Sequence, residues 1–352
     1  WQCCKQHFIL VQAMMRGISL LKFTLKLFIT DIKYAIHFRR FENQLICKRT
    51  LTTGGGIELK RSSPCFMGVA FDHRYMPVEL AYTSYQETAK ETVPGPPIII
   101  SHGLLGSKSN WHSISKVLSK TGRQVIAVDA RNHGESPHVV ETSYFRMSDD
   151  IIHLMDELEI SKATLMGHSM GGKTSMLTAI LKPERVAGLI VVDVSPRQSP
   201  VAGSFPAYLE QMLKIGLQIY DKDKNVSLST ARREAMEKLR EVEENVTIRE
   251  FLATNLIERN NKIQWRVNLD SLITFYSDLC RFPTIDECYT GPTLFLAGEN
   301  SQHVTESDLP VIEKLFPNCQ VRYVEGAGHW VHSEKPLLFL KHVKHFLEET
   351  LL

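Results

Sequence analysis

The segment Gly167-His168-Ser169-Met170-Gly171 constrains the fold of this chain more than any other. It follows the apolar run 163–166, which is typical of a buried strand, and precedes the helix-like stretch 173–181. A Gly-x-Ser-x-Gly pattern in this setting predicts a sharp turn, because a side chain at either glycine would collide with the neighbouring strand or helix. Such a turn pushes the serine hydroxyl out of the fold, where a base can activate it. Ser169 is therefore a candidate nucleophile.

Apolar strands alternate with helix-like segments through most of the chain. Runs such as 98–100 and 187–192 carry no polar side chain, so both faces of these strands are expected to be buried. This alternation predicts an α/β protein whose central sheet is mostly parallel and covered by helices on both faces. Further strands are expected at 78–82, 124–128, 293–296 and 320–324, and further helices at 148–158, 309–316 and 336–350.

The alternation is interrupted between residues 196 and 291, where only helix-like segments are recognisable. We therefore expect a core formed by residues 66–195 and 292–352, with a helical cap, residues 196–291, inserted into it. A cap of this kind supplies an apolar pocket wall, or simply packs onto the core. Its helices are expected at 207–220, 229–244, 248–256 and 269–279, and the candidate wall residues are Phe205, Tyr208, Leu209 and Met212.

Residues 1–65 form a basic extension with 11 Lys/Arg and 3 Asp/Glu. On a helix, Lys22, Lys26 and Lys33 would form a basic stripe along an otherwise apolar rod, and charges within the apolar stretch argue against a membrane-spanning helix. An acid-poor amphipathic leader is typical of a mitochondrial transit peptide, which predicts a location in the mitochondrial matrix. A membrane-surface anchor on a cytoplasmic protein and mistranslated upstream sequence are the alternatives.

Charge and cysteine content argue against two other classes of protein. Residues 66–352 carry 30 Lys/Arg and 36 Asp/Glu, so this part has no basic footprint for nucleic acid. The seven cysteines are an odd number, and the three that follow the extension, Cys280, Cys288 and Cys319, show no metal-ligand spacing. They indicate a reducing compartment, and no metal or cofactor is expected.

A nucleophilic serine needs a base, and His329 is the candidate. It lies in the segment 326–330, directly after the last expected strand and before the last helix. Loops at the carboxyl ends of parallel strands are where open α/β sheets build their sites. Of the nearby histidines, His332 is expected at the surface, whereas His102 and His168 precede segments that supply backbone donors.

The base in turn needs an acid to orient it, and Asp193 is the first choice. It ends an apolar strand, one strand beyond the candidate nucleophile and at the same edge of the sheet. A carboxylate in this position needs a partner, and an imidazole N–H is a suitable one. An acid is also expected after the strand 293–296, but Ser301 stands there. Asp270 and Glu299 are the alternatives, and Asp193 could instead cap a helix or fix a loop.

Two further loops are expected at the same edge of the sheet. The segment 102–107 follows the first buried strand, and its Leu104 N–H, together with the Met170 N–H, is expected to form an oxyanion hole. The second loop, 129–136, contains Asp129, Arg131 and Glu135. We expect an Arg–carboxylate contact inside this segment, with a structural role.

Together these motifs resemble the α/β-hydrolase superfamily over residues 68–350. The segments 167–173 (GHSMGGK), 192–196 (VDVSP), 265–270 (WRVNLD) and 298–301 (GENS) are similar to the α/β-hydrolase domain-containing protein 11 group and its bacterial esterase relatives. The resemblance implies a mitochondrial protein that acts on carboxylic esters, with diacylglycerol as a suggested substrate. It also implies that the acid follows the sixth strand, which favours Asp193, although Asp270 has been a candidate by similarity.

The sequence thus predicts a serine hydrolase of carboxylic esters. Ser169 would attack the ester carbonyl, His329 would move the proton, and a small lipid or ester would be the substrate. Contact with a membrane surface is a further expectation, and no protein partner is indicated. A thioesterase, an acyltransferase and a hydrolase-fold protein that binds a partner are the alternatives.

Overall fold

The computed structural model describes residues 76–86, 95–198, 204–220 and 226–350. The chain divides into two units, 1–69 and 70–352, and all that follows concerns the second. The predicted N-terminal extension, with its transit peptide or anchor, lies outside the described residues.

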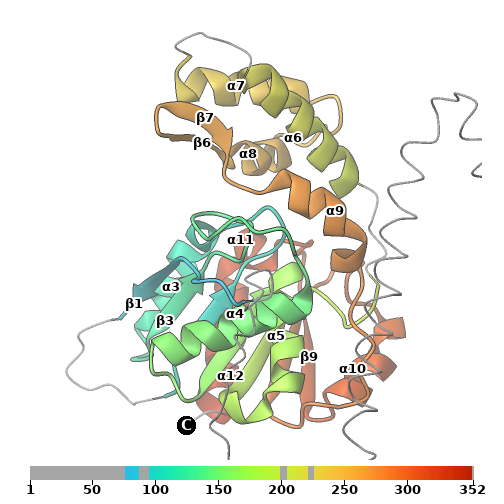
Figure 1. The fold of residues 1–352 in the computed structure, drawn as a ribbon. Coiled ribbons are helices and arrows are strands. Elements are labelled where there is room, and N and C mark those ends of the chain that lie inside the picture. The colour runs from blue at the N-terminus through green and yellow to red at the C-terminus, as the bar shows by residue number, and fades with distance from the viewer. Residues whose placement is uncertain (1–75, 87–94, 199–203, 221–225, 351–352) are drawn as a thin grey trace, which may run out of the picture. The chain divides into compact units, whose positions relative to one another are not determined.

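Seven strands form the central sheet in the order β1-β3-β2-β4-β5-β8-β9 (Figure 1). The edge strand β1 is antiparallel to β3, and every other neighbouring pair is parallel, which confirms the predicted sheet. The strands are β1 (Tyr82–Tyr85), β2 (Ile98–Ser101), β3 (Val125–Val128), β4 (Ala163–His168), β5 (Val186–Val192), β8 (Thr293–Gly298) and β9 (Cys319–Val324).

The first strand begins later than the sequence predicts. It was expected over 78–82 but starts at Tyr82. The Val78 N–H donates a hydrogen bond to Asp150 Oδ1 at 2.8 Å, so a side chain from another element takes the place of a strand partner.

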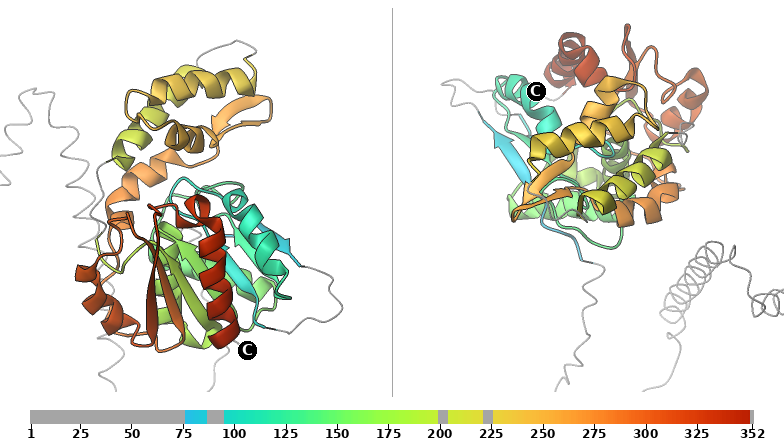
Figure 2. Two further views of the ribbon diagram at one scale, coloured as in Figure 1. Left: turned by 180° about the vertical axis from the view of Figure 1, so that it is seen from behind. Right: turned by 90° about the horizontal axis from the view of Figure 1, so that it is seen from above.

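Helices cover both faces of the sheet, as the continuous apolar strands predict. Side chains alternate along a strand, so Ile98 and Ile100 pack with α3 and α12, whereas Ile99 packs with α4, α5 and α10. Seen from behind in Figure 2, α12 crosses the face of the sheet. The core helices are α3 (His112–Ser119), α4 (Tyr144–Glu157), α5 (Met170–Leu181), α10 (Leu309–Leu315), α11 (Val331–Glu334) and α12 (Pro336–Thr350), with short 3-10 turns η3 (Lys108–Trp111), η4 (Pro183–Arg185) and η5 (Glu306–Asp308).

Between β5 and β8, the described residues form four helices and a two-stranded antiparallel hairpin, and we call these elements the cap. The helices lie close to their predicted positions, but the hairpin contradicts the expectation of helices alone. Its turn residues Asn260 and Asn261 both have positive φ, +53° and +57°, as a two-residue hairpin turn requires. The Asn-Asn pair was thus a usable sequence signal. The elements are α6 (Phe205–Tyr220), α7 (Leu228–Leu239), α8 (Val246–Ala253), β6 (Leu256–Arg259), β7 (Lys262–Trp265) and α9 (Leu269–Cys280).

Candidate active site

Ser169 stands at a strained turn between β4 and α5. Its φ of +52° is rare for a residue with a side chain, and its N–H donates to Val192 O at 3.0 Å. A Cβ on Gly167 would lie 2.1 Å from Gly171 O, and one on Gly171 would lie 2.3 Å from Ser101 O. Both positions therefore exclude a side chain, as the sequence pattern predicts, and the close packing holds the serine in its strained conformation.

His329 and Asp193 are brought together from loops that follow β9 and β5. His329 Nδ1 lies 2.7 Å from Asp193 Oδ2, and the Asp193 side chain is fully buried. Since Asp193 accepts this contact, the ring carries its proton on Nδ1 and leaves Nε2 as the basic nitrogen. Ser169 and His329 line the same cavity. The three residues named first from the sequence thus share one edge of the sheet.

Ser301, which occupies the place where an acid was missing, hydrogen-bonds to the acid that is present. Its hydroxyl donates to Asp193 Oδ2 at 2.5 Å, and its own oxygen accepts the His303 N–H at 3.2 Å. The Gly298 N–H donates to the other carboxylate oxygen, Asp193 Oδ1, at 2.8 Å. The buried carboxylate therefore has a donor on each oxygen in addition to His329, which offsets the free energy of removing it from water.

The alternative acids lie elsewhere. Asp270 is exposed in the first turn of α9 and lines a separate groove on the cap. Glu299 is also exposed, and its Oε2 accepts the Gly326 N–H at 2.9 Å. Of the three candidate carboxylates, Asp193 is the one in contact with His329.

Burial disfavours the charged form of both Asp193 and His329. It raises the pKa of Asp193 to about 6, while the hydrogen bonds from Ser301 and Gly298 act in the opposite direction. Burial also lowers the pKa of the His329 imidazole, and the neighbouring His332 adds to that effect. His329 is therefore neutral near pH 7, which is the form that can accept a proton.

Three more histidines surround His329. The His303 ring stacks on it with ring centroids 3.8 Å apart, and His168 Nε2–H donates to the His329 carbonyl at 2.9 Å. The expectation that His332 lies at the surface is wrong. It is 7% exposed, because its ring stacks on Trp111 at 4.1 Å and also contacts the rings of His168 and Phe339.

The expected oxyanion donors lie beside Ser169. Met170 is the first residue of α5, where helix N–H groups have no partner within the helix. Leu104 lines both cavities that meet at the serine. A Cβ on the preceding Gly103 would lie 2.7 Å from His168 Nδ1, so the loop can approach the elbow this closely only with glycine at that position.

Two cavities meet at Leu104, Ser169 and Phe205. One, of about 110 Å³, is lined by His329 and Trp330, and the other, of about 40 Å³, is lined by residues that include Tyr144 and Lys173. Phe205 of the cap is thus a wall residue, as expected. The other three candidate wall residues do not line these cavities but belong to the apolar cluster that joins the cap to the core, and these are Tyr208, Leu209 and Met212.

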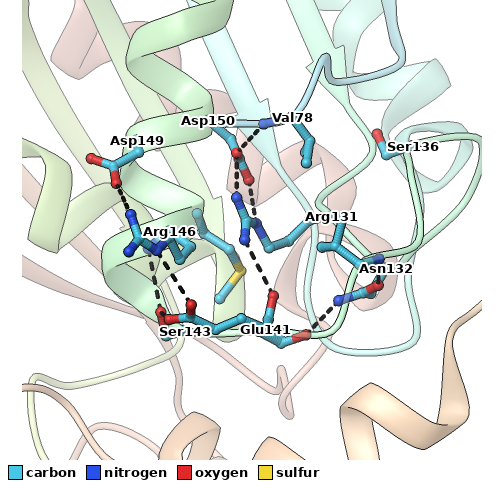
Figure 3. A network of polar contacts seen from close by, with 12 residues as sticks. Val78, Arg131, Asn132, Ser136, Glu141, Ser143, Arg146, Asp149 and Asp150 are labelled. Carbon is cyan, nitrogen blue, oxygen red and sulfur yellow. Dashed lines mark hydrogen bonds and ion pairs between the residues drawn. The ribbon is translucent and has the colours of Figure 1, made fainter. Parts of the chain in front are cut away.

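The expected Arg–carboxylate contact in the loop 129–136 has a different partner. Figure 3 shows Arg131 directed at Asp150 of α4, with both nitrogen–oxygen distances 2.6 Å. Asp129 instead accepts from Lys108 Nζ, also at 2.6 Å. The prediction of a contact inside the segment was wrong, because the fold places Asp150, 19 positions away in sequence, against Arg131. The role is structural, as predicted, since the pair fastens the loop to α4.

In the described ranges, no group of three or more His, Cys, Asp or Glu side chains has an arrangement that could hold a metal ion. No helix in that part of the chain is long and apolar enough to cross a bilayer.

Comparison with known proteins gives a consistent picture. The alpha/beta hydrolase fold family matches residues 96–336. The sn-1-specific diacylglycerol lipase ABHD11 of Danio rerio is 42% identical over 77% of this chain and 83% of its own length. Esterase YbfF of Escherichia coli is 30% identical over 75% of this chain and 97% of its own. Among solved structures, a marine microorganism esterase with 32% identity covers 77% of this chain and all of that chain, with a TM-score of 0.68.

The fold, the serine elbow and the buried histidine–aspartate pair define a hydrolase of the esterase and lipase type. The chain belongs to the alpha/beta hydrolase fold family, and the relatives named above include a diacylglycerol lipase of the ABHD11 type.

Proposed function

We propose that this protein hydrolyses carboxylic esters through a triad of Ser169, His329 and Asp193, with acylglycerols such as diacylglycerol as substrates. The observation that carries the triad is the 2.7 Å contact between His329 Nδ1 and Asp193 Oδ2 beside the cavity that contains Ser169. The names of the ABHD11 relatives support the acylglycerol substrate.

The reaction follows from the proton positions. His329 Nε2 takes the proton from the Ser169 hydroxyl as its oxygen bonds to the ester carbonyl carbon, and the N–H groups of Leu104 and Met170 hold the resulting oxyanion. His329 then gives the proton to the departing alcohol, and the acyl group remains on the serine. A water molecule, deprotonated by His329, releases the acid and restores the serine. Asp193 stays ionised and stabilises the imidazolium at each step.

The leaving alcohol is assigned to the larger cavity, because His329 must reach the departing oxygen and lines only that cavity among the two at Ser169. The acyl group then lies in the smaller one. This division predicts that acyl length affects turnover more sharply than the size of the alcohol.

A fluorophosphonate probe tests the triad, because it labels only an activated serine. We expect the wild type to be labelled and Ser169→Ala not to be. The rate of labelling should fall at least 100-fold in His329→Ala and in Asp193→Asn. It should change little in Asp270→Asn. If Asp270→Asn loses labelling and Asp193→Asn keeps it, the acid of the triad is Asp270 of the cap and not Asp193.

Turnover of a diacylglycerol, a short-chain nitrophenyl ester and an acyl thioester tests the substrate class. Faster hydrolysis of the thioester would favour a thioesterase, and transfer of the acyl group to an added alcohol would favour an acyltransferase. A folded wild type that neither labels nor hydrolyses any of the three would favour a binding protein.

We also propose that the basic extension, residues 1–65, directs the protein to the mitochondrial matrix. The absence of acidic residues before Asp31 supports this proposal. Fusing these residues to a fluorescent protein tests the proposal, and we expect the fusion in the mitochondrial matrix. A fusion that binds to another membrane or stays diffuse in the cell would contradict the proposal.

A further inference from the structure

A side chain of the cap bonds directly to the loop that carries the proposed oxyanion donor. Asn255 lies between α8 and β6 and is fully buried. Its Nδ2 donates to Leu105 O at 2.9 Å, and more weakly to Leu252 O at 3.3 Å. Leu105 directly follows Leu104, whose N–H is the proposed donor. The cap therefore reaches the catalytic loop through one defined hydrogen bond.

The cap itself fixes which way the Asn255 amide faces. Arg266 Nε donates to Asn255 Oδ1 at 3.1 Å, and the Arg266 N–H donates to Asn255 O at 2.8 Å. With the oxygen engaged by a guanidinium, the NH₂ group must point to Leu105 O. Arg266, which directly follows the hairpin, thus holds the donor in place before any substrate binds.

On its other side, Leu105 is held by the core. Its N–H donates to His133 Nε2 at 3.2 Å, and His133 Nδ1–H donates to Arg131 O at 3.0 Å. Burial lowers the pKa of His133 to about 3, so the ring stays neutral and Nε2 can accept a hydrogen bond. Both peptide groups that flank Leu105 are therefore fixed, one by the core and one by the cap.

Leu105 needs such support because its backbone is strained. It has a φ of +61°, in the left-handed region that a leucine rarely adopts. Strained conformations persist only where surrounding contacts hold them, and they are typical of catalytic sites. Without the Asn255 contact, only the His133 contact and the Gly106 N–H bond to Gly103 O at 2.9 Å would hold the turn 103–106. Loosening of this turn would shift the Leu104 N–H, which lies within it, relative to the oxyanion.

We propose that Asn255 is a positioning residue through which the cap completes the oxyanion hole. This inference rests on the proposed ester hydrolysis at Ser169. It makes the cap part of the catalytic apparatus as well as a wall of the pocket, since the hole reaches its working geometry only with the cap docked.

The test is Asn255→Asp, which keeps the shape and the acceptor for Arg266 but removes the donor to Leu105 O. With 4-nitrophenyl acetate, we expect kcat per titrated serine to fall about 10- to 100-fold. This fall is smaller than the one caused by removing an oxyanion donor altogether, because the Leu104 N–H is displaced and not lost. KM should stay within threefold of the wild type. The matched thionoester separates mechanism from general damage, because sulfur accepts hydrogen bonds poorly. The ratio of ester to thionoester turnover should fall along with kcat.

Asn268→Asp is the matched control. Asn268 also joins the cap to the core, but its Nδ2 donates to Asn132 Oδ1 and Val139 O and does not contact the loop 102–107. We expect its kcat and its ester to thionoester ratio to stay within twofold of the wild type. If Asn255→Asp does not fold, as judged by circular dichroism, Asn255→Ser removes the same donor without adding a charge and carries the same expectation.

Two results would overturn the proposal. One is an unchanged ester to thionoester ratio in both Asn255 variants. The other is an equal fall in Asn268→Asp, which would assign the effect to loosening of the cap. Neither result contradicts ester hydrolysis if the wild type is still labelled at Ser169 and still hydrolyses the ester. A wild type that is inactive would instead refute the proposed function itself.

Discussion

Replacing Asp150 with asparagine should destabilise the fold strongly, because it leaves a buried guanidinium without its counter-ion. The Arg131 and Asp150 side chains are only 2% and 1% exposed and share two contacts of 2.6 Å (Figure 3). Removing one partner of such a pair costs about 3–5 kcal/mol, because the remaining charge is neither solvated nor paired.

The expected shift in melting temperature follows from the size of the unit. Unit 70–352 unfolds with an entropy of about 0.6 kcal/mol/K, at about 2.1 cal/mol/K per residue. A loss of about 3–5 kcal/mol then lowers Tm by about 5–8 °C. Differential scanning calorimetry of the wild type and Asp150→Asn measures this shift directly.

An exposed ion pair provides the control. Arg185 NH2 lies 2.7 Å from Asp156 Oδ1, but these side chains are 21% and 59% exposed. Asp156→Asn should therefore cost at most about 1 kcal/mol and lower Tm by no more than about 2 °C. Equal shifts in the two variants would refute the reasoning from burial. The double change of Arg131→Met with Asp150→Leu should regain at least half of the lost Tm, since no buried charge is left unpaired.

Two further predictions concern the site. Activity should fall as the pH drops through about 6, where the Asp193 carboxylate takes up a proton. Ser301→Ala removes a hydrogen bond that lowers this pKa. In a plot of kcat/KM against pH, the acid limb should therefore move to higher pH in this variant. An acid limb that does not move would mean that a group other than Asp193 titrates there. Gly167→Ala places a methyl group 2.1 Å from Gly171 O, and it should abolish fluorophosphonate labelling. Normal labelling of a folded Gly167→Ala protein would show that the elbow can open without loss of function.

Much of the fold could be predicted because its signals are local in the chain. Strand β5 is apolar along its length, so it had to be buried on both faces, and α5 follows the elbow within one residue. The position of His329 after the last strand followed in the same way. The hairpin turn at Asn260 and Asn261 was missed because the helical pattern around it was given more weight, although its signal was also local.

Contacts between distant segments could not be predicted from such signals. Arg131 has carboxylates near it in sequence, yet its partner is Asp150, and His332 follows a loop but is buried against Trp111. Asn255 has no motif around it, and its contact with Leu105 joins residues 150 positions apart. Each of these pairings depends on how whole elements pack.

The sequence by itself therefore determined the α/β architecture, the serine elbow and the order of the candidate site residues along the chain. These depend on burial patterns and backbone geometry within a few residues, which the amino-acid types specify directly. Only the tertiary structure decided that Asp193 and not Asp270 meets His329, and that Ser301 and Asn255 support the site. A hydrogen bond forms within about 3 Å, and only the packing of sheet, loops and cap brings distant side chains that close.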